Sequence, residues 1–414
     1  GALPQSGTVV SGQAQWQQGG NRLDITQGSG KAAINWQSFD IGSGAQVNIV
    51  QPGAQSVLLN RVVGADPSGL YGKLSANGQV LLVNPNGIVF GKGSQVDVGG
   101  LVASTLDIAD GDFNAGRMTF TRNGKGGAVT HQGTINAASG GYVALLAPQV
   151  LNEGVISARL GTVALAAGDA VTLQLDGSQL LGVKVDPSTI DALVENRQLV
   201  QAEGGRVILS AGAAQRLREH AVAGTGGANA LVASADGTLR LVAAGGRVEA
   251  GSGEVAVSGS TVEASGSVHA ATIGVQADHL SQGGTLDASG TAAGGRIAVD
   301  AGVVVQTASA QLKADGGTQG GEIRVAGGST VYSSATFSAQ GRAGSGGDIA
   351  VSADSVQLRA ATLDASGAQG GGRVRVGGGF HGQDTDIANA RHVGINGTTV
   401  LRADATASGD GGRI

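Results

Sequence analysis

Four copies of one signature decide the fold of this chain: GGRIAV at 294–299, GGEIRV at 320–325, GGDIAV at 346–351 and GGRVRV at 371–376. Their matching apolar residues follow one another after 26, 26 and 25 residues and are Ile297, Ile323, Ile349 and Val374. A corner of the form Leu-Asp-Ala-Ser-Gly precedes two of the copies, at 286–290 and 363–367. A unit of about 25 residues is too small to bury its own apolar face, so the copies must stack on one another.

Each repeat holds two or three short runs in which apolar and polar residues alternate, and Gly, Asn, Asp or Ser bounds each run. Such runs are typical of strands, and the residues between them are typical of turns. Stacked strands form one continuous core, and each rung adds a layer about 4.8 Å high. The sequence therefore predicts an all-β fold, a parallel β-helix.

The composition agrees with thin, repeated layers. Gly accounts for 75 of the 414 residues, aromatic residues make up 3%, and charged residues make up 14%, against a usual charged share of about 25%. Val, Ile, Leu and Ala must therefore fill the core. Because 41% of the residues are hydrophobic and many of them alternate, we expect a folded chain and not a disordered one.

Charge and cysteine usage limit the partners. The net charge is −5, and the 26 Lys and Arg residues are scattered, so the basic patch that nucleic-acid binding requires is missing. The absence of Cys fits a reducing cytosol, but it fits equally a chain that passes unfolded through a membrane pore. No stretch approaches the roughly 18 apolar residues of a membrane helix, so we expect no membrane-spanning segment.

The first part of the chain is less regular than the second. Signatures recur as GGRVIL at 204–209 and GGRVEA at 245–250, and the rungs become uniform beyond about residue 240. We therefore expect one domain over 1–242 and a repeat stalk over 243–414 with a period of about 25 residues. The final residues, 411–414, lie within a signature, so the stalk is expected to continue beyond them.

Two short helices are expected to interrupt the strands. The first is predicted over Ser188–Val194, where Ser188 and Asp191 form a capping box, and the second over Ala213–His220, with Leu217 facing inward.

Asn84, Pro85, Asn86 and Gly87 form a polar corner between two apolar runs, 79–83 and 88–90. Pro85 presets φ for the second position of a type I turn, the Asn84 side chain can hydrogen-bond its own backbone, and Gly87 tolerates a positive φ. The motif therefore predicts a tight turn that joins two strands. Chemistry alone requires nothing more of it, although a turn can also be a recognised element.

The run from Gln51 to Ile108 carries a family resemblance. It contains SVLLNRV at 56–62, ANGQVLLVNPNGI at 76–88 and GLVAST at 100–105, and it resembles the N-terminal secretion domain of two-partner-secreted exoproteins, the filamentous-haemagglutinin-like family. Within that family it is similar to the branch that includes high-molecular-weight adhesins, haem-haemopexin-binding exoproteins and biofilm matrix adhesins. The resemblance covers roughly residues 1–240, and the later rungs resemble the stalk of the family only generically.

The resemblance implies a right-handed parallel β-helix with an N-terminal cap and short hairpins or helices outside the helix. It also implies a monomer that crosses the periplasm and is secreted or held at the bacterial surface. The partner during export would be an outer-membrane transporter, which recognises the chain through its polypeptide-transport-associated domains.

The resemblance also bears on single residues. Asn84, Pro85, Asn86 and Gly87 would be the tight turn of the family. Asn60 and Arg61 would be either recognition residues or part of a buried polar ladder, of which the ladder is the simpler interpretation. Some branches carry a second element, Asn-Pro-Asn-Leu, which this chain lacks, so the residues that the partner touches stay open.

Several functions remain after this resemblance. Adhesion to an extracellular polysaccharide or a host-cell glycan is the first, and haem-carrier capture and delivery of a contact-dependent toxin are alternatives within the family. A glycan-cleaving β-helix enzyme is the alternative from another class, but acids that could pair, such as Asp364, Asp384 and Asp386, lie in turns. The chain also lacks GxSxG and HExxH motifs. We therefore expect no enzyme and no cofactor.

A metal site is not expected either, because the six His residues are scattered without ligand spacing. Calcium stays an alternative at the Asp-Gly pairs 236–237, 315–316 and 410–411. Asp is also a common turn former, and the calcium-binding nonapeptide pattern is not repeated.

Overall fold

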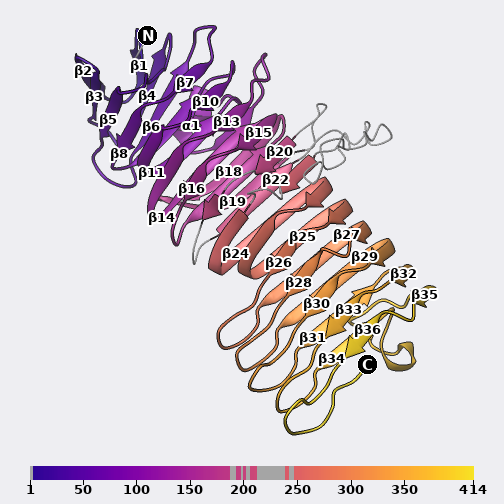
Figure 1. Ribbon diagram of the computed structural model, residues 1–414. Coiled ribbons are helices and arrows are strands. Elements are labelled where there is room, and N and C mark those ends of the chain that lie inside the picture. The colour runs from indigo at the N-terminus through magenta and orange to yellow at the C-terminus, as the bar shows by residue number, and fades with distance from the viewer. Residues whose placement is uncertain (1–2, 187–192, 197–198, 202–205, 212–237, 242–246) are drawn as a thin grey trace. The chain divides into compact units, whose positions relative to one another are not determined.

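The computed structural model describes residues 3–186, 193–196, 199–201, 206–211, 238–241 and 247–414 (Figure 1). These residues fall into two compact units, one that reaches Thr238 and one that begins at Leu239. The expected boundary at Val242 lies outside the described residues, as do the helix expected over Ala213–His220 and its Leu217.

Three stacks of parallel strands build the first unit. Stack A holds β4 (Lys31–Trp36), β6 (Val57–Val62), β9 (Gln79–Val83), the ends of β11 (Gln95–Ser104) and β14 (Thr134–Ala147), β17 (Thr162–Ala167) and β22 (Arg206–Ala211). Stack B holds β3 (Arg22–Gln27), β5 (Gln46–Val50), β8 (Lys73–Ala76), the beginnings of β11 and β14, β16 (Val155–Ser157) and β21 (Leu199–Gln201). Stack C holds β7 (Ser68–Leu70), β10 (Ile88–Phe90), β13 (Val129–His131), β15 (Gln149–Asn152) and β20 (Leu193–Asn196).

An antiparallel cap closes the first rung. β1 (Thr8–Ser11) pairs antiparallel with β4, and β2 (Ala14–Gly19) forms a hairpin with β3. Trp16 packs on Trp36 with ring centroids 4.9 Å apart, and Trp36 meets Phe39 edge-on at 6.0 Å. The aromatic rings therefore fill the end that a preceding rung would otherwise cover.

In stack A, strands β6, β9 and β17 are buried on both of their faces. Leu58, Val80 and Leu82 point into the helix, whereas Leu59 and Leu81 point outward and are still 0% exposed. Their cover lies outside the β-helix. It consists of α1 (Asp110–Ala115) and a three-stranded antiparallel sheet of β12 (Met118–Thr121), β18 (Ala170–Asp176) and β19 (Gln179–Val185). Strands covered on both faces read as continuous apolar runs, which explains the sequences of β6 and β9.

The structure corrects the helix that was expected over Ser188–Val194. Leu193 and Val194 do not end a helix that begins at Ser188, because they open strand β20, and Val194 pairs with Val150 in stack C. Residues 188–192, including Asp191, lie outside the described part. The described extra α-helix is α1.

Three parallel stacks also build the second unit. Stack D holds the central parts of β24 (Arg247–Ala264) and β25 (Ser267–Gln282), the beginnings of β27 (Arg296–Gln306) and β29 (Glu322–Ser333), then β31 (Asp348–Ser352) and β34 (Arg373–Val376). Stack E holds the ends of the same four long strands, β32 (Ser355–Leu358) and β35 (His392–Ile395). Stack F holds the beginnings of β24 and β25, then β26 (Thr285–Asp287), β28 (Gln311–Lys313), β30 (Thr336–Ser338), β33 (Thr362–Asp364) and β36 (Val400–Arg402). The remaining strand, β23, spans Thr238–Leu241.

The repeat signature explains this register. Ile297, Ile323, Ile349 and Val374 pair in turn along stack D, and each is at most 1% exposed. The predicted parallel β-helix is therefore confirmed, and each period of the sequence adds one rung.

One rung of the second unit carries an insertion. Residues 353–354 separate β31 from β32, whereas residues 377–391 separate β34 from β35. We call residues 377–391 the insertion loop; it includes a 3₁₀ turn at Phe380–Gly382. Among the described residues of the chain, no helix has the length and apolar character to cross a membrane.

Candidate functional site

The predicted turn is present with the predicted strands on either side, β9 and β10. The Gly87 N–H donates to the Asn84 carbonyl at 3.1 Å, and the Asn86 N–H donates to Asn84 Oδ1 at 3.0 Å. Gly87 has φ of +130°, which a residue with a Cβ rarely adopts. Backbone chemistry thus accounts for the first asparagine and the glycine of the motif.

The Asn84 side chain fastens this turn to the corner before it. Asn84 is 0% exposed, and its Nδ2 donates to the Asp66 carbonyl at 3.0 Å and to Ser68 Oγ at 2.9 Å. Asn86 is half-buried, and its Nδ2 donates to the Gly64 carbonyl at 2.9 Å. The two asparagines therefore bond three residues of the corner at 63–68, which lies one rung earlier.

The next corner, at 124–128, closes on the other side of the turn. The Gly127 N–H donates to the Pro85 carbonyl at 3.2 Å, and the Ile88 N–H donates to the Ala128 carbonyl at 3.0 Å. A Cβ on Gly127 would lie 2.5 Å from the backbone nitrogen of Gly87. The turn is thus the middle layer of three corners in van der Waals contact, and Pro85 and Asn86 stay half-exposed.

Asn60 lies in the interior of the β-helix. It is 0% exposed, accepts a hydrogen bond from Trp36 Nε1 at 3.0 Å, and donates to the Leu81 carbonyl at 3.4 Å. Its register neighbours are Ile34 and Leu82. It is therefore a single buried amide that ties strand β6 to the cap, and it belongs to no ladder of stacked polar residues.

Arg61, the next residue, points to the outer face of stack A and holds the beginning of α1. Its Nε lies 3.0 Å from Asp107 Oδ1, its Nη1 lies 2.7 Å from Asp110 Oδ1, and its Nη2 donates to the Ile108 carbonyl. Burial lowers the pKa of the guanidinium, but the hydrogen bonds to Asp110 and Asp107 outweigh it and raise the pKa above its ordinary value. Arg61 thus forms a clamp between β6 and the helix.

A second link between stack A and its cover was not predicted. Gln79 Nε2 donates to the carbonyl of Gly177, in the turn between β18 and β19, at 3.0 Å, and Gln79 Oε1 accepts from the Tyr142 hydroxyl at 2.6 Å. Both side chains are 0% exposed, and burial raises the pKa of Tyr142. Gln79 begins the strand that precedes the predicted turn. Its partners lie far away in the sequence, so no local motif indicates these bonds.

His131 ends strand β13 inside the β-helix. It is 0% exposed, its Nδ1 lies 2.8 Å from Asn152 Oδ1, and its ring meets Phe90 edge-on at 5.8 Å. Burial lowers the pKa of His131 to about 4, although the bond to Asn152 opposes the shift. Because Asn152 Oδ1 is an acceptor, Nδ1 carries the proton of the neutral ring.

The acids form turns and ion pairs. Asp315 Oδ1 accepts from Ser338 Oγ at 2.6 Å and from the Gln340 N–H at 2.8 Å. Asp236 lies outside the described residues, Asp410 is exposed, and no three His, Asp or Glu side chains gather into a metal site within the part of the chain that the structure describes.

Asp384 and Asp386 differ from the expectation of ordinary turns. They lie in the insertion loop, where Asp386 Oδ1 is 2.8 Å and Asp384 Oδ2 is 3.1 Å from Arg375 Nη1, and Arg324 Nη2 lies 2.7 Å from Asp386 Oδ2. The hydrogen bond from Arg375 holds the pKa of Asp386 well below its usual range. Asp364 instead accepts from the Ser366 N–H at 2.9 Å, within its own corner.

Comparisons with known proteins bear on the first unit above all. The model of a family described as TPS secretion domain matches residues 1–229, more than half of the chain. A heme/hemopexin-binding protein of Haemophilus influenzae is 36% identical over 218 residues, which are 50% of this chain and 24% of that protein. Another heme/hemopexin-binding protein of H. influenzae is 42% identical over 113 residues, which are 27% of this chain and 12% of that protein. The chain thus spans about a quarter or less of the relatives that it matches.

A solved structure supports the architecture. The HMW1 secretion domain from H. influenzae is similar with a TM-score of 0.67 and 23% identity, and the match covers 98% of this chain and 100% of that one. At this identity the likeness bears on the fold alone.

Proposed function

Because this chain belongs to the family of TPS secretion domains, we propose that its first unit is the element by which an outer-membrane transporter selects the protein for export. The match over residues 1–229 carries this proposal, since it contains the turn at 84–87 together with Asn60 and Arg61. Membership of a two-partner secretion family implies such a transporter and secretion through the outer membrane.

The burial of Asn60, Asn84 and Arg61 indicates the stage at which a transporter would bind them. Asn60, Asn84 and Arg61 are at most 9% exposed in the folded unit, and hydrogen bonds occupy their side chains. A transporter could reach them only before the rungs form, when the same polar groups are free. We propose that these residues act twice, first as recognition groups in the extended chain and then as internal bonds of the folded rungs.

Folding outside the membrane would then oppose return of the chain. Burial of apolar surface stabilises the folded state by roughly 25 cal/mol per Å², and the second unit adds such surface with every rung. The mechanism requires no nucleotide.

Export is tested by replacing Asn84 and Asn86 with Ala in the full-length gene, expressed with its transporter. Protein at the surface and in the supernatant is measured, and Asn114→Ala serves as the control because Asn114 is exposed on α1. We expect secretion to fall in the double variant and to stay unchanged in the control. Undiminished secretion of the double variant would contradict a role of the turn in export.

A second measurement separates recognition from folding. The purified double variant is refolded from urea, and the recovery of β-structure is followed by circular dichroism. Normal refolding with low secretion supports recognition of the extended chain, whereas a refolding rate that falls as much as secretion would show that the turn acts through folding alone.

For the second unit we propose adhesion to an extracellular polysaccharide or a host-cell glycan, without a catalytic role. Retention of the purified chain on matrix polysaccharide, with and without residues 243–414, tests this function, and equal, negligible retention would overturn it. New reducing or unsaturated ends after incubation with acidic polysaccharides would overturn the non-catalytic part.

Haem-carrier capture is the second candidate, and the 36% identity with a heme/hemopexin-binding protein favours it. The activity that this name describes belongs to a protein of which the matched part is 24%. Co-precipitation of the purified chain with haem-loaded haemopexin tests whether the present residues are sufficient, and the first unit alone is the informative comparison.

A further inference from the structure

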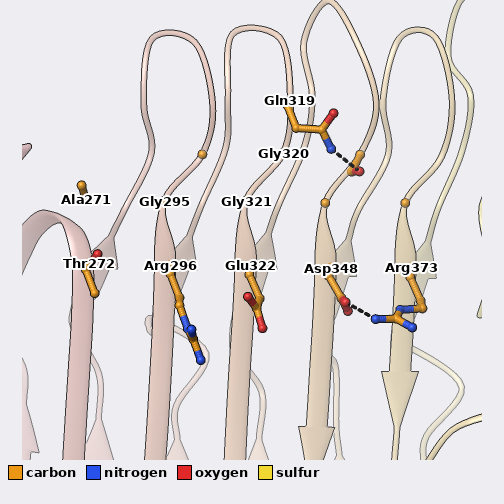
Figure 2. Close-up of a pocket in the computed structure, with 14 residues that line it drawn as sticks. Ala271, Thr272, Gly295, Arg296, Gln319, Gly320, Gly321, Glu322, Asp348 and Arg373 are labelled. Carbon is orange, nitrogen blue, oxygen red and sulfur yellow. Dashed lines mark hydrogen bonds and ion pairs between the residues drawn. The ribbon is translucent and has the colours of Figure 1, made fainter. Parts of the chain in front are cut away.

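A groove crosses the rungs of the second unit where the repeats begin. It has a volume of about 680 Å³, and successive strands of stack D line it with Thr272, Arg296, Glu322, Asp348 and Arg373 (Figure 2). Gln319 lines it from a corner loop that precedes a strand. The groove therefore runs across the strands, with one side chain from each of five strands along it.

The glycine pairs of the repeat signature keep the floor of this groove bare. A Cβ on Gly295 would lie 2.0 Å from the Ala271 carbonyl oxygen, and one on Gly321 would lie 2.2 Å from the Gly295 carbonyl oxygen. Real Cβ atoms do not approach backbone so closely, so these positions accept only glycine. The backbone of one rung therefore touches that of the next at these glycines. The Gln319 side chain reaches this floor, where its Nε2 donates to the Gly346 carbonyl at 3.4 Å (Figure 2).

The charges along the groove are unequal. Asp348 pairs with Arg373, and Glu322 lies 2.8 Å from Arg324 Nε (Figure 2 shows the first pair). Arg296 is exposed and makes no ion pair within the described part of the chain. The groove thus offers one uncompensated positive charge, and carboxylates stand on the two rungs that follow it.

We propose that this groove binds one extended polysaccharide chain that lies across the rungs and carries widely spaced carboxylates. The proposal rests on the adhesion function proposed above and names its surface and its ligand class. Among the described residues no large apolar side chain lines the groove, so it lacks the aromatic and aliphatic anchors on which protein interfaces depend. Hydroxyl-rich sugar rings suit its polar walls, and each rung advances by about 4.8 Å, close to the length of one sugar ring.

The charges that line the groove determine how the carboxylates should be spaced along the bound polysaccharide. The fork of Arg296 can hold one sugar carboxylate through two parallel hydrogen bonds. A carboxylate on every sugar would also face Glu322 and Asp348, and like charges at close range repel. A chain with an acid on alternate sugars leaves a neutral sugar beside Glu322 and places its next acid two rungs from Arg296, where Arg373 pairs with Asp348. It therefore meets less repulsion than a chain with an acid on every sugar, and a neutral chain forgoes the bond to Arg296.

The test compares three probes on the full chain by isothermal titration: hyaluronan fragments, with an acid on alternate sugars, polygalacturonate, with an acid on every sugar, and dextran, which is neutral. We expect hyaluronan to bind tightest. Arg296→Gln should weaken its binding about fivefold, in line with an exposed charge-assisted bond. Thr272→Trp should also weaken it by obstructing the groove, and both residues are exposed, so folding should persist.

Arg402→Gln is the matched control, because Arg402 is exposed and lies in stack F, away from the groove. It should bind hyaluronan as the unchanged chain does. If the unchanged chain binds hyaluronan but Arg296→Gln and Thr272→Trp bind it equally well, the groove is not the site, although adhesion stands. If polygalacturonate binds as tightly as hyaluronan, the spacing argument is wrong. If none of the three probes binds while cells or matrix still retain the chain, the polysaccharide assignment falls and adhesion has another ligand.

Discussion

Acid should weaken the first unit through one buried histidine. His131 is 0% exposed, and burial lowers its pKa to about 4 in the folded state, against about 6.5 in an unfolded chain. The unfolded chain therefore takes up the proton first as the pH falls. The contribution of neutral His131 to stability is complete above pH 6.5 and is lost progressively between about pH 6.5 and pH 4.

The size of this loss follows from the two pKa values. At pH 5 protonation favours the unfolded state about 30-fold, which corresponds to about 2 kcal/mol. Below pH 4 the loss reaches its limit of about 3 kcal/mol, since the shift of the pKa is then fully expressed. A loss of this size is a large fraction of the roughly 5–15 kcal/mol that stabilises a typical domain.

Urea unfolding at pH 7.5, 6 and 5 measures this effect. Trp16 and Trp36 are the only two tryptophans of the chain, and both lie in the first unit, so their fluorescence reports that unit. His131→Asn removes the titrating group beside Asn152, and His279→Asn replaces an exposed histidine as a control. The stability difference between the unchanged chain and His131→Asn should shift by about 2 kcal/mol from pH 7.5 to pH 5. Parallel pH profiles of these two proteins would refute the argument.

Three further substitutions test single contacts. Tyr142→Phe leaves the buried Oε1 of Gln79 without its 2.6 Å donor and should lower the free energy of unfolding by about 1–2 kcal/mol in the same urea assay. Gly127→Ala forces a Cβ to within 2.5 Å of backbone and should cost at least about 2 kcal/mol, whereas Gly30→Ala, where a Cβ meets nothing within 4 Å, should be nearly neutral. Arg375→Met removes the ion pairs that Arg375 makes with Asp384 and Asp386 of the insertion loop, and only the pair of Asp386 with Arg324 remains. Deuterium uptake in the loop should rise roughly tenfold, with uptake elsewhere unchanged; protection that persists would show that the ion pairs of Arg375 do not order the loop.

The stacked rungs and the turn at 84–87 could be predicted from the sequence, because both depend on residues that are local or regularly spaced in the chain. Ile297 and Ile323 stack because the repeat places them 26 residues apart on successive rungs, and the turn at 84–87 follows from bonds within four residues. Contacts between distant segments leave no repeat or motif in the sequence, so they could not be predicted. Arg61 reaches Asp110 across 49 residues, and Gln79 reaches Gly177 across 98.

Tertiary pairing also overrides local signals. Ser188 and Asp191 form a capping-box pattern, but Val194 is 0% exposed in stack C, where it pairs with Val150. A buried β-branched residue gains more from the ladder than one turn of helix offers. The role of the turn, of Asn60 and of Arg61 in recognition by a transporter stays a proposal.

The position of the cover in the chain affects how the first unit folds. The outward residues of β6 and β9, such as Leu59 and Leu81, need the sheet of β12, β18 and β19, which is complete only at Val185. If the chain emerges from its N-terminus, this apolar face stays open until that residue is outside. Exposed apolar patches of this kind promote association. We therefore expect the first unit to fold as one cooperative block, whereas the second unit can fold one rung at a time. A chain that ends at Gly168 lacks β18 and β19 and should bind the dye ANS strongly and self-associate in analytical ultracentrifugation. A monomeric truncated chain with no dye binding would show instead that the first rungs are stable without their cover.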